Sequence, residues 1–265
     1  MANQNTTRVT FLGASTALPT AAEDNASFVI NDTHMVDTPS SAARALLQAG
    51  LDPVQLRTVI FTHFHHDHYM GLPQLLFYRA MKGCWQGDPG PLMLCGPGDL
   101  DRVVRLSHAF LQAEAYPVVW PTITSRILAP GDTACGPGFR LQAIAARHAV
   151  EGLCYRFTDT ATGAVIVFTG DTEYHEPIAE LARGADLLIH EASFAADASR
   201  SAIEQTRHST TIDAARVAKL ADVRKLALIH YDTAHSEERL AEALSIFPNA
   251  VLAKAGETLE VSHAP

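Results

Sequence analysis

Residues 62–68 read Thr-His-Phe-His-His-Asp-His and contain four potential metal ligands, His63, His65, Asp67 and His68. The apolar run Thr58-Val59-Ile60-Phe61 comes directly before them. Histidine is the commonest side-chain ligand of transition metals, and a carboxylate among imidazoles adds the negative charge that a second divalent ion needs nearby. This spacing is typical of one half of a two-metal site.

The cluster lies between an expected strand and an expected helix, which gives its side chains two directions of approach. Side chains two residues apart in a strand point the same way, so His63 and His65 can hold one ion together. Asp67 and His68 fall where the chain turns into the helix and suit a neighbouring ion. The alternative is a histidine-rich surface loop that binds metal adventitiously. The strand-to-helix junction favours the two-metal site, because ligand sites are commonly built there.

The chain resembles the metallo-β-lactamase superfamily, whose signature His-x-His-x-Asp-His is matched without substitution by these four residues. The family expects three further ligands, each after a strand, and His148, Asp171 and His230 fill those places in order. The resemblance implies an α/β fold, the four-layer αββα sandwich. It also implies two ligand sets that share one aspartate: His63, His65 and His148 for one ion, Asp67, His68 and His230 for the other, and Asp171 bridging both.

Taken from the residues alone, each later candidate is ambiguous. A lone histidine after an apolar strand is more often a hydrogen-bonded packing residue than a ligand. The early cluster needs completing, however, which favours the ligand interpretation of His148 and His230. Thr169-Gly170-Asp171-Thr172 is typical of a strand end whose glycine lets the backbone pass close to an ion.

Three further segments are similar to the ribonuclease Z branch of the superfamily, with its related phosphodiesterases and arylsulfatases. They are the loop Phe11 to Pro19, the segment His190-Glu191-Ala192-Ser193 and the segment His208-Ser209-Thr210. The resemblance implies that His208 binds or protonates the leaving oxygen and that Glu191 orients it. Alternatively, Glu191 ends a strand and His208 lies in a polar loop.

Two departures from that branch bear on the substrate. Enzymes of the branch that process tRNA carry a long arm between the third metal motif and the bridging aspartate, whereas the span from His148 to Asp171 holds little more than a hairpin. The formal net charge of −9 provides no global basic field for a polyanion. Both features predict that nucleic acid is not a partner.

The Asp-x-Gly motif that the family expects after an early strand is also altered, since Thr38-Pro39 follow Asp37. This change puts the supporting contacts of Asp37 in doubt.

Composition is compatible with one intracellular domain over residues 1–265, because a chain of this length can bury a substantial core and no linker divides it. The four cysteines form no CxxC pair, which favours reduced, buried thiols. Residues 1–8 lack a secretion signal, and no later segment could span a bilayer. We therefore expect a cytoplasmic protein without a membrane partner.

Short apolar strands alternate with amphipathic helices along the chain. The expected strands are Arg8–Leu12, Ser27–Ile30, Met35–Val36, Thr58–Phe61, Pro91–Cys95, Phe139–Ala145, Leu153–Phe157, Val165–Phe168, Asp186–Ile189, Lys225–Ile229 and Val251–Leu252. The expected helices are Ser40–Ala49, Tyr69–Ala80, Leu100–Ala113, Glu176–Arg183, Ile212–Leu220 and Ser236–Leu244. Ser40 and Thr211 are candidate helix caps.

These features predict a metal-dependent hydrolase in which two divalent ions share a hydroxide. The expected metal is zinc, with manganese and iron as alternatives. Asp67 would also receive the proton of the attacking water, beside His208 and Glu191. The leading substrate class is a small phosphodiester or similar ester; lactones, aryl sulfates, thioesters and precursor tRNA are alternatives, as is a non-catalytic metal-binding module. The resemblance also implies a homodimer.

Overall fold

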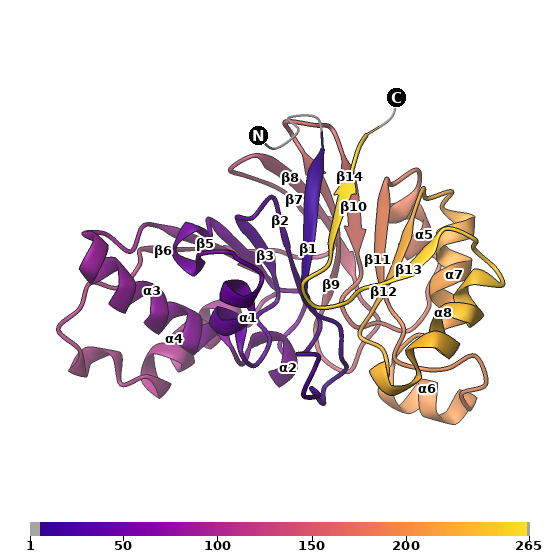
Figure 1. Ribbon diagram of the computed structural model, residues 1–265, viewed down its shortest axis with the longest axis horizontal. Helices are drawn as coiled ribbons and strands as arrows, with labels where there is room; N and C mark the ends of the chain where they lie inside the picture. Colours follow the sequence, from indigo (N-terminus) through magenta and orange to yellow (C-terminus); the bar gives the residue numbers. More distant parts are fainter. Residues whose placement is uncertain (1–5, 264–265) are drawn as a thin grey trace.

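The computed structural model describes residues 6–263 and confirms the expected αββα sandwich. In Figure 1 two sheets face each other at the centre of the molecule, and helices cover their outer faces. Within the described residues no helix combines the length and apolarity needed to cross a membrane. Residues 1–5, most of the segment searched for a secretion signal, lie outside the described part.

The first sheet has the strand order β14-β1-β2-β3-β4-β5-β6. Its strands are β1 (Thr7–Gly13), β2 (Ser27–Ile30), β3 (His34–Val36), β4 (Thr58–Ile60), β5 (Leu92–Gly96), β6 (Ile123–Ile127) and β14 (Thr258–Val261). Helices α1 (Ala42–Gln48), α3 (Leu72–Gln86) and α4 (Leu100–Phe110) lie on its outer side, and the short α2 (His66–Tyr69) lies near one end (Figure 1). Two 3-10 turns, η1 (Pro53–Gln55) and η2 (Ala113–Ala115), belong to this half.

The second sheet has the order β13-β12-β11-β10-β9-β8-β7. Its strands are β7 (Thr133–Gly136), β8 (Phe139–Ala145), β9 (Leu153–Asp159), β10 (Val165–Phe168), β11 (Leu187–Glu191), β12 (Leu226–Ile229) and β13 (Ala250–Leu252). Helices α5 (Pro177–Ala182), α7 (Thr211–Leu220) and α8 (Ser236–Leu244) cover it, and α6 (Arg200–Thr206) lies below them in Figure 1. The 3-10 turn η3 (Thr233–His235) precedes α8.

Aromatic side chains fill the space between the two sheets. Phe28 of β2 meets Phe168 of β10 edge to face, with ring centroids 5.5 Å apart. Tyr155 of β9 is fully buried, packs on Phe168 and donates a hydrogen bond to the carbonyl oxygen of Phe61. Each sheet contains four adjacent parallel strands, β3 to β6 and β10 to β13. The loops that leave the carboxyl ends of such strands are where open α/β sheets place their ligands.

The eleven expected strands are all present, whereas β6, β7 and β14 were missed. These three lie at sheet edges and are largely solvent-exposed, so their sequences lack a buried apolar run. Helix α6, which buries no residue, was also missed. The expected helix Tyr69–Ala80 is wrong at its start, because α2 ends at Tyr69 and α3 begins at Leu72. Gly71 lies in this break against the carbonyl oxygen of Pro39, where a β-carbon would collide.

The two expected caps are each displaced by one residue. Ser41 precedes α1, and the carboxylate of Asp24 accepts a hydrogen bond from its backbone N–H. Thr210 caps α7 in a reciprocal capping box with Asp213. The expectation of four buried thiols is wrong for two of them: Cys95 and Cys154 are buried, but Cys84 and Cys135 are exposed.

Candidate metal centre

Seven side chains from both halves of the chain meet at one edge of the sandwich. Four come from the segment after β4: His63 and His65 lie in the turn, and Asp67 and His68 belong to α2. The other three follow strands of the second sheet: His148 after β8, Asp171 after β10 and His230 after β12. The backbone of His63 also pairs with Gly152, which joins the two halves at this point.

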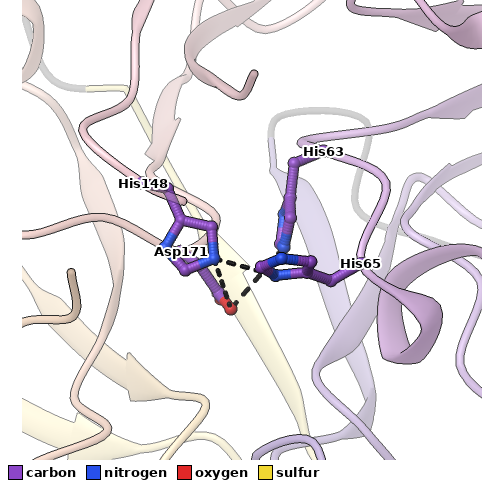
Figure 2. Close-up of side chains that lie close together, drawn as sticks. All are labelled: His63, His65, His148 and Asp171. Carbon is purple, nitrogen blue, oxygen red and sulfur yellow. Dashed lines mark hydrogen bonds and ion pairs between the residues drawn. The ribbon is translucent and has the colours of Figure 1, made fainter. Parts of the chain in front are cut away.

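The first group of side chains consists of His63, His65, His148 and Asp171, whose ligand atoms all lie within 4.8 Å of one another. His148 Nε2 lies 2.9 Å from His65 Nδ1, and His63 Nε2 lies 3.7 Å from Asp171 Oδ2. Figure 2 shows the three rings converging on the Asp171 carboxylate. Three imidazole nitrogens and one carboxylate oxygen form a donor set suited to a transition-metal ion.

The second group consists of Asp67, His68, Asp171 and His230, again within 4.8 Å. His68 Nε2 lies 3.4 Å from Asp67 and 3.4 Å from Asp171 Oδ1. His230 Nε2 lies 3.4 Å from Asp67 and 3.4 Å from Asp171 Oδ2. Asp171 therefore belongs to both groups, which is the arrangement of a dinuclear site with a shared carboxylate.

Unsatisfied polar atoms at the centre support this interpretation. His63 Nε2, His68 Nε2 and Asp171 Oδ1 are buried without a hydrogen-bond partner. Buried polar atoms are rarely left unpaired in folded proteins, because their desolvation costs about 1–3 kcal/mol each. All three belong to the two groups and face their other members, so the residues fit a divalent ion in each group.

The charges of the centre also suit cations. Burial opposes ionisation of Asp171, but the neighbouring His230, His68 and His63 hold its pKa well below the usual range. Burial has the same effect on Asp67, but the hydrogen bond with His230 and the nearby His68 lower the pKa of that carboxyl far below its usual value. Burial, with His68 alongside, lowers the pKa of His63 and keeps its ring neutral. Burial opposes protonation of His68, but Asp171 and Asp37 raise the pKa of this ring well above its usual value, so it loses a proton when it binds metal. Anionic carboxylates and neutral imidazoles are the protonation states in which these groups bind metal.

Hydrogen bonds on the far side of the rings fix their orientation. His148 Nδ1 lies 3.0 Å from the carbonyl oxygen of Arg207, and the Arg207 side chain donates back to the carbonyl oxygen of His148. His68 Nδ1 lies 2.8 Å from Asp37 Oδ2. Such outer contacts select the tautomer that turns the other ring nitrogen towards a metal.

The doubt about the supporting contacts of Asp37 was wrong. Its carboxylate accepts hydrogen bonds from the backbone N–H and the hydroxyl of Thr62, each at 2.8 Å, as well as from His68. Asp37 adopts a φ of 54°, a conformation that aspartate tolerates better than most residues. The altered motif therefore keeps its carboxylate in place.

His208 and Glu191 lie beside the second group. His208 Nδ1 is 2.9 Å from Glu191 Oε1, and its ring stacks on that of His230 with centroids 5.4 Å apart. Burial opposes protonation of His208, but the Glu191 carboxylate raises its pKa to about 9. The His208 ring is 17% exposed, so it has access to solvent. Glu191 ends β11 as the alternative interpretation held, yet it also contacts His208 directly.

Comparisons with known proteins agree with this geometry. The family described as "Beta-lactamase superfamily domain" matches residues 33–231. The ribonuclease Z of Synechococcus sp. strain CC9902 is 30% identical over 96% of this chain and 98% of its own length. That of Methanosarcina acetivorans is 26% identical over 97% and 99%. Among solved structures, Bacillus subtilis YhfI, titled a metallo-beta-lactamase fold protein, and the short form of human tRNase Z share this fold. Both have a TM-score of 0.79, with 24% and 22% identity, over 97% of this chain and 99–100% of theirs.

These relatives overturn the expectation that excluded nucleic acid as a partner, because they are named as enzymes of RNA. Net charge misled the prediction, since it averages over the whole surface. Locally, the exposed Arg147 and Arg207 flank His148. The family match, the two ligand groups and the matched relatives lead to one assignment: this chain belongs to the metallo-β-lactamase superfamily of hydrolases, in the branch of ribonuclease Z and the related phosphodiesterases.

Proposed function

We propose that this protein is a metal-dependent phosphodiesterase of the ribonuclease Z type, which cleaves a phosphodiester bond in RNA, with precursor tRNA as the substrate class. The observation that carries the proposal is the placement of His208 and Glu191 beside two ligand groups that share Asp171. A purely structural metal site would need no such additional pair. The names of the relatives supply the substrate class.

The seven ligands would be His63, His65, Asp67, His68, His148, Asp171 and His230, with zinc as the preferred metal for an imidazole-rich set. Two bound ions would supply an ionised water at neutral pH and offset charge on the phosphate of the substrate. Asp67 would orient the attacking water as an anionic hydrogen-bond acceptor, since His68 and His230, each 3.4 Å from its carboxylate, keep that carboxylate ionised. His208, held by Glu191, would donate a proton to the departing oxygen of the ribose.

Two exposed arginines neighbour the ligand His148, one along the chain and one in space. Arg147 precedes His148 in the chain, and the Arg207 guanidinium is anchored to the carbonyl oxygen of His148 at 3.2 Å. Both side chains are exposed. Guanidinium groups bind phosphates through charge-assisted hydrogen bonds, so this pair would hold the RNA backbone next to the scissile phosphate.

A small phosphodiester is the second candidate, and the length of the chain favours it. The alignment with the Synechococcus relative runs over 318 positions, against 265 residues here, so at least 53 positions of that relative have no counterpart. Between His148 and Asp171 the structure contains only the hairpin of β9 and β10. The shorter chain and the short hairpin in this span favour a smaller substrate.

The test uses the purified, zinc-loaded protein with labelled precursor tRNA, bis(p-nitrophenyl) phosphate, p-nitrophenyl sulfate and a lactone. We expect cleavage of the RNA, loss of activity in chelator and recovery on return of metal. Arg147→Ala with Arg207→Ala should weaken RNA cleavage and reduce its salt dependence, whereas Arg183→Ala, which changes an exposed arginine directly after α5, should not. Hydrolysis of bis(p-nitrophenyl) phosphate without RNA cleavage would favour the second candidate. Activity on the sulfate or lactone alone would contradict both.

A further inference from the structure

The Ser193 hydroxyl lies within hydrogen-bond distance of both His208 and His230. Ser193 lies two residues beyond β11, in a segment held by its neighbours: the backbone N–H of Phe194 donates to Ser209, and Phe194 pairs with Thr210. Its hydroxyl oxygen is 2.7 Å from Glu191 Oε2, 2.8 Å from His230 Nδ1 and 3.2 Å from His208 Nδ1. It is absent from the ligand and catalytic residues expected from sequence.

The direction of these hydrogen bonds follows from the groups involved. A hydroxyl donates one hydrogen bond and accepts two, and the carboxylate at 2.7 Å can only accept. The Ser193 hydroxyl therefore donates to Glu191 and accepts from the N–H at His230 Nδ1. With that proton fixed on Nδ1, the lone pair of His230 is on Nε2, which faces Asp67 and Asp171 at 3.4 Å.

Glu191 uses both of its oxygens in this arrangement. Oε1 accepts from the backbone N–H of Thr172 at 2.8 Å and from His208 at 2.9 Å. Oε2 accepts from the backbone N–H of Ser193 at 3.1 Å and from its hydroxyl. Glu191, His208 and His230 also lie close enough to suggest a third metal group, but the carboxylate already has four donors. The cluster is thus explained by hydrogen bonds without a third ion.

We propose that Ser193 is a positioning residue that connects His230 to Glu191, so that one buried carboxylate orients both His208, directly, and His230, through the serine hydroxyl. The proposal rests on the proposed two-ion site but not on the identity of the substrate. It predicts that the hydroxyl of Ser193 strengthens ion binding at the second group, formed by Asp67, His68, Asp171 and His230. The contact between His208 and Glu191 does not depend on that hydroxyl.

The test is a zinc titration of the metal-depleted protein by calorimetry, with metal content measured after dialysis. In Ser193→Ala we expect one of the two ions to lose 10–100-fold in affinity, as is typical when an outer partner of a ligand is removed. The other ion should bind as in the wild type, and activity should recover at raised zinc concentration. Ser193→Thr, which keeps the hydroxyl, should restore the affinity.

Ser209→Ala is the matched control, because the Ser209 hydroxyl is buried nearby but donates to the carbonyl oxygen of Thr172. It should change thermal stability without changing either zinc affinity. Wild-type affinities in Ser193→Ala, or equal losses in Ser193→Thr and Ser193→Ala, would overturn the role of Ser193 while leaving the proposed function intact. If the wild type takes up no zinc, both proposals fail.

Discussion

Asp37 accepts a hydrogen bond from His68 Nδ1 at 2.8 Å, from a backbone position with a φ of 54°. The two residues are 31 positions apart. Asp37 directly follows β3, and His68 lies in α2, which comes after β4, the parallel neighbour of β3. Asp37 is buried and also binds Thr62, so it fixes the turn that carries the ligand cluster. One carboxylate thus orients a ring and anchors the loop on which that ring depends.

Asp37→Asn should weaken metal binding by 10–100-fold without unfolding the protein. Asparagine keeps the shape and tolerates the positive φ, but it removes the charge that holds the Nδ1 proton of His68. The measurement is zinc affinity by competition with a chelator. Asp32→Asn is the control, because Asp32 has a φ of 61° in the preceding turn but pairs with the half-buried Arg8. Equal losses in both variants would mean that the backbone, and not the hydrogen bond to His68, is responsible.

His208→Ala should reduce kcat for an RNA substrate by 10²–10⁴, the usual contribution of a general acid. The same change should have a much smaller effect on bis(p-nitrophenyl) phosphate, because p-nitrophenolate departs without a proton. Metal content should not change, since His208 belongs to neither of the two ligand groups. Equal losses on the two substrates would rule out protonation of the leaving group as the role of His208.

The strands inside the two sheets could be predicted because they are short apolar runs. Val165 to Phe168, for example, is buried at every residue, as expected for a central strand covered on both faces. The edge strand β14 is exposed or half-buried at every residue but Val261 and carries no such signal. The break between α2 and α3 depends on Gly71 meeting the Pro39 carbonyl oxygen, a contact between distant parts of the chain. A contact between residues so far apart in the chain leaves no recognisable pattern in the local sequence.

The same distinction applies to the site. The seven candidate ligands follow strand ends in order, so a family resemblance was sufficient to predict which residues meet. Asp37 and Ser193 support those residues through contacts that span 31 and 37 positions, to His68 and His230. An aspartate before Thr38-Pro39 or a serine in a loop can have many roles. Only the folded structure shows that these two hold His68 and His230 in place.

Gly170→Ala should destabilise the protein more than Gly184→Ala, although both glycines have positive φ, 57° and 62°. A β-carbon at Gly170 would lie 2.5 Å from the β-carbon of Thr62, whereas at Gly184 it would meet nothing within 4 Å. Gly184→Ala should therefore cost about 1 kcal/mol for the left-handed backbone alone. Gly170→Ala should cost about 1–3 kcal/mol more for the collision and should displace Asp171. Urea unfolding measures the difference; equal costs would contradict the close contact with Thr62.

His34→Leu should make the unfolding free energy less sensitive to pH between about 6.5 and 4. Burial between the sheets, with Arg57 nearby, lowers the pKa of His34 to about 4, and its ring packs edge-on against Phe139. Below pH 6.5 the unfolded chain binds a proton at His34 that the folded protein does not, so stability falls as the pH drops towards 4. The loss attributable to His34 is about 3 kcal/mol, at 1.36 kcal/mol for each unit of pKa shift. Urea unfolding of both proteins from pH 7.5 to 4 isolates this contribution, because the metal centre is common to both. We expect the difference in unfolding free energy between the wild type and His34→Leu to narrow at low pH, or to change sign in favour of the leucine variant. Parallel curves would mean that His34 takes up its proton equally in the folded and unfolded states.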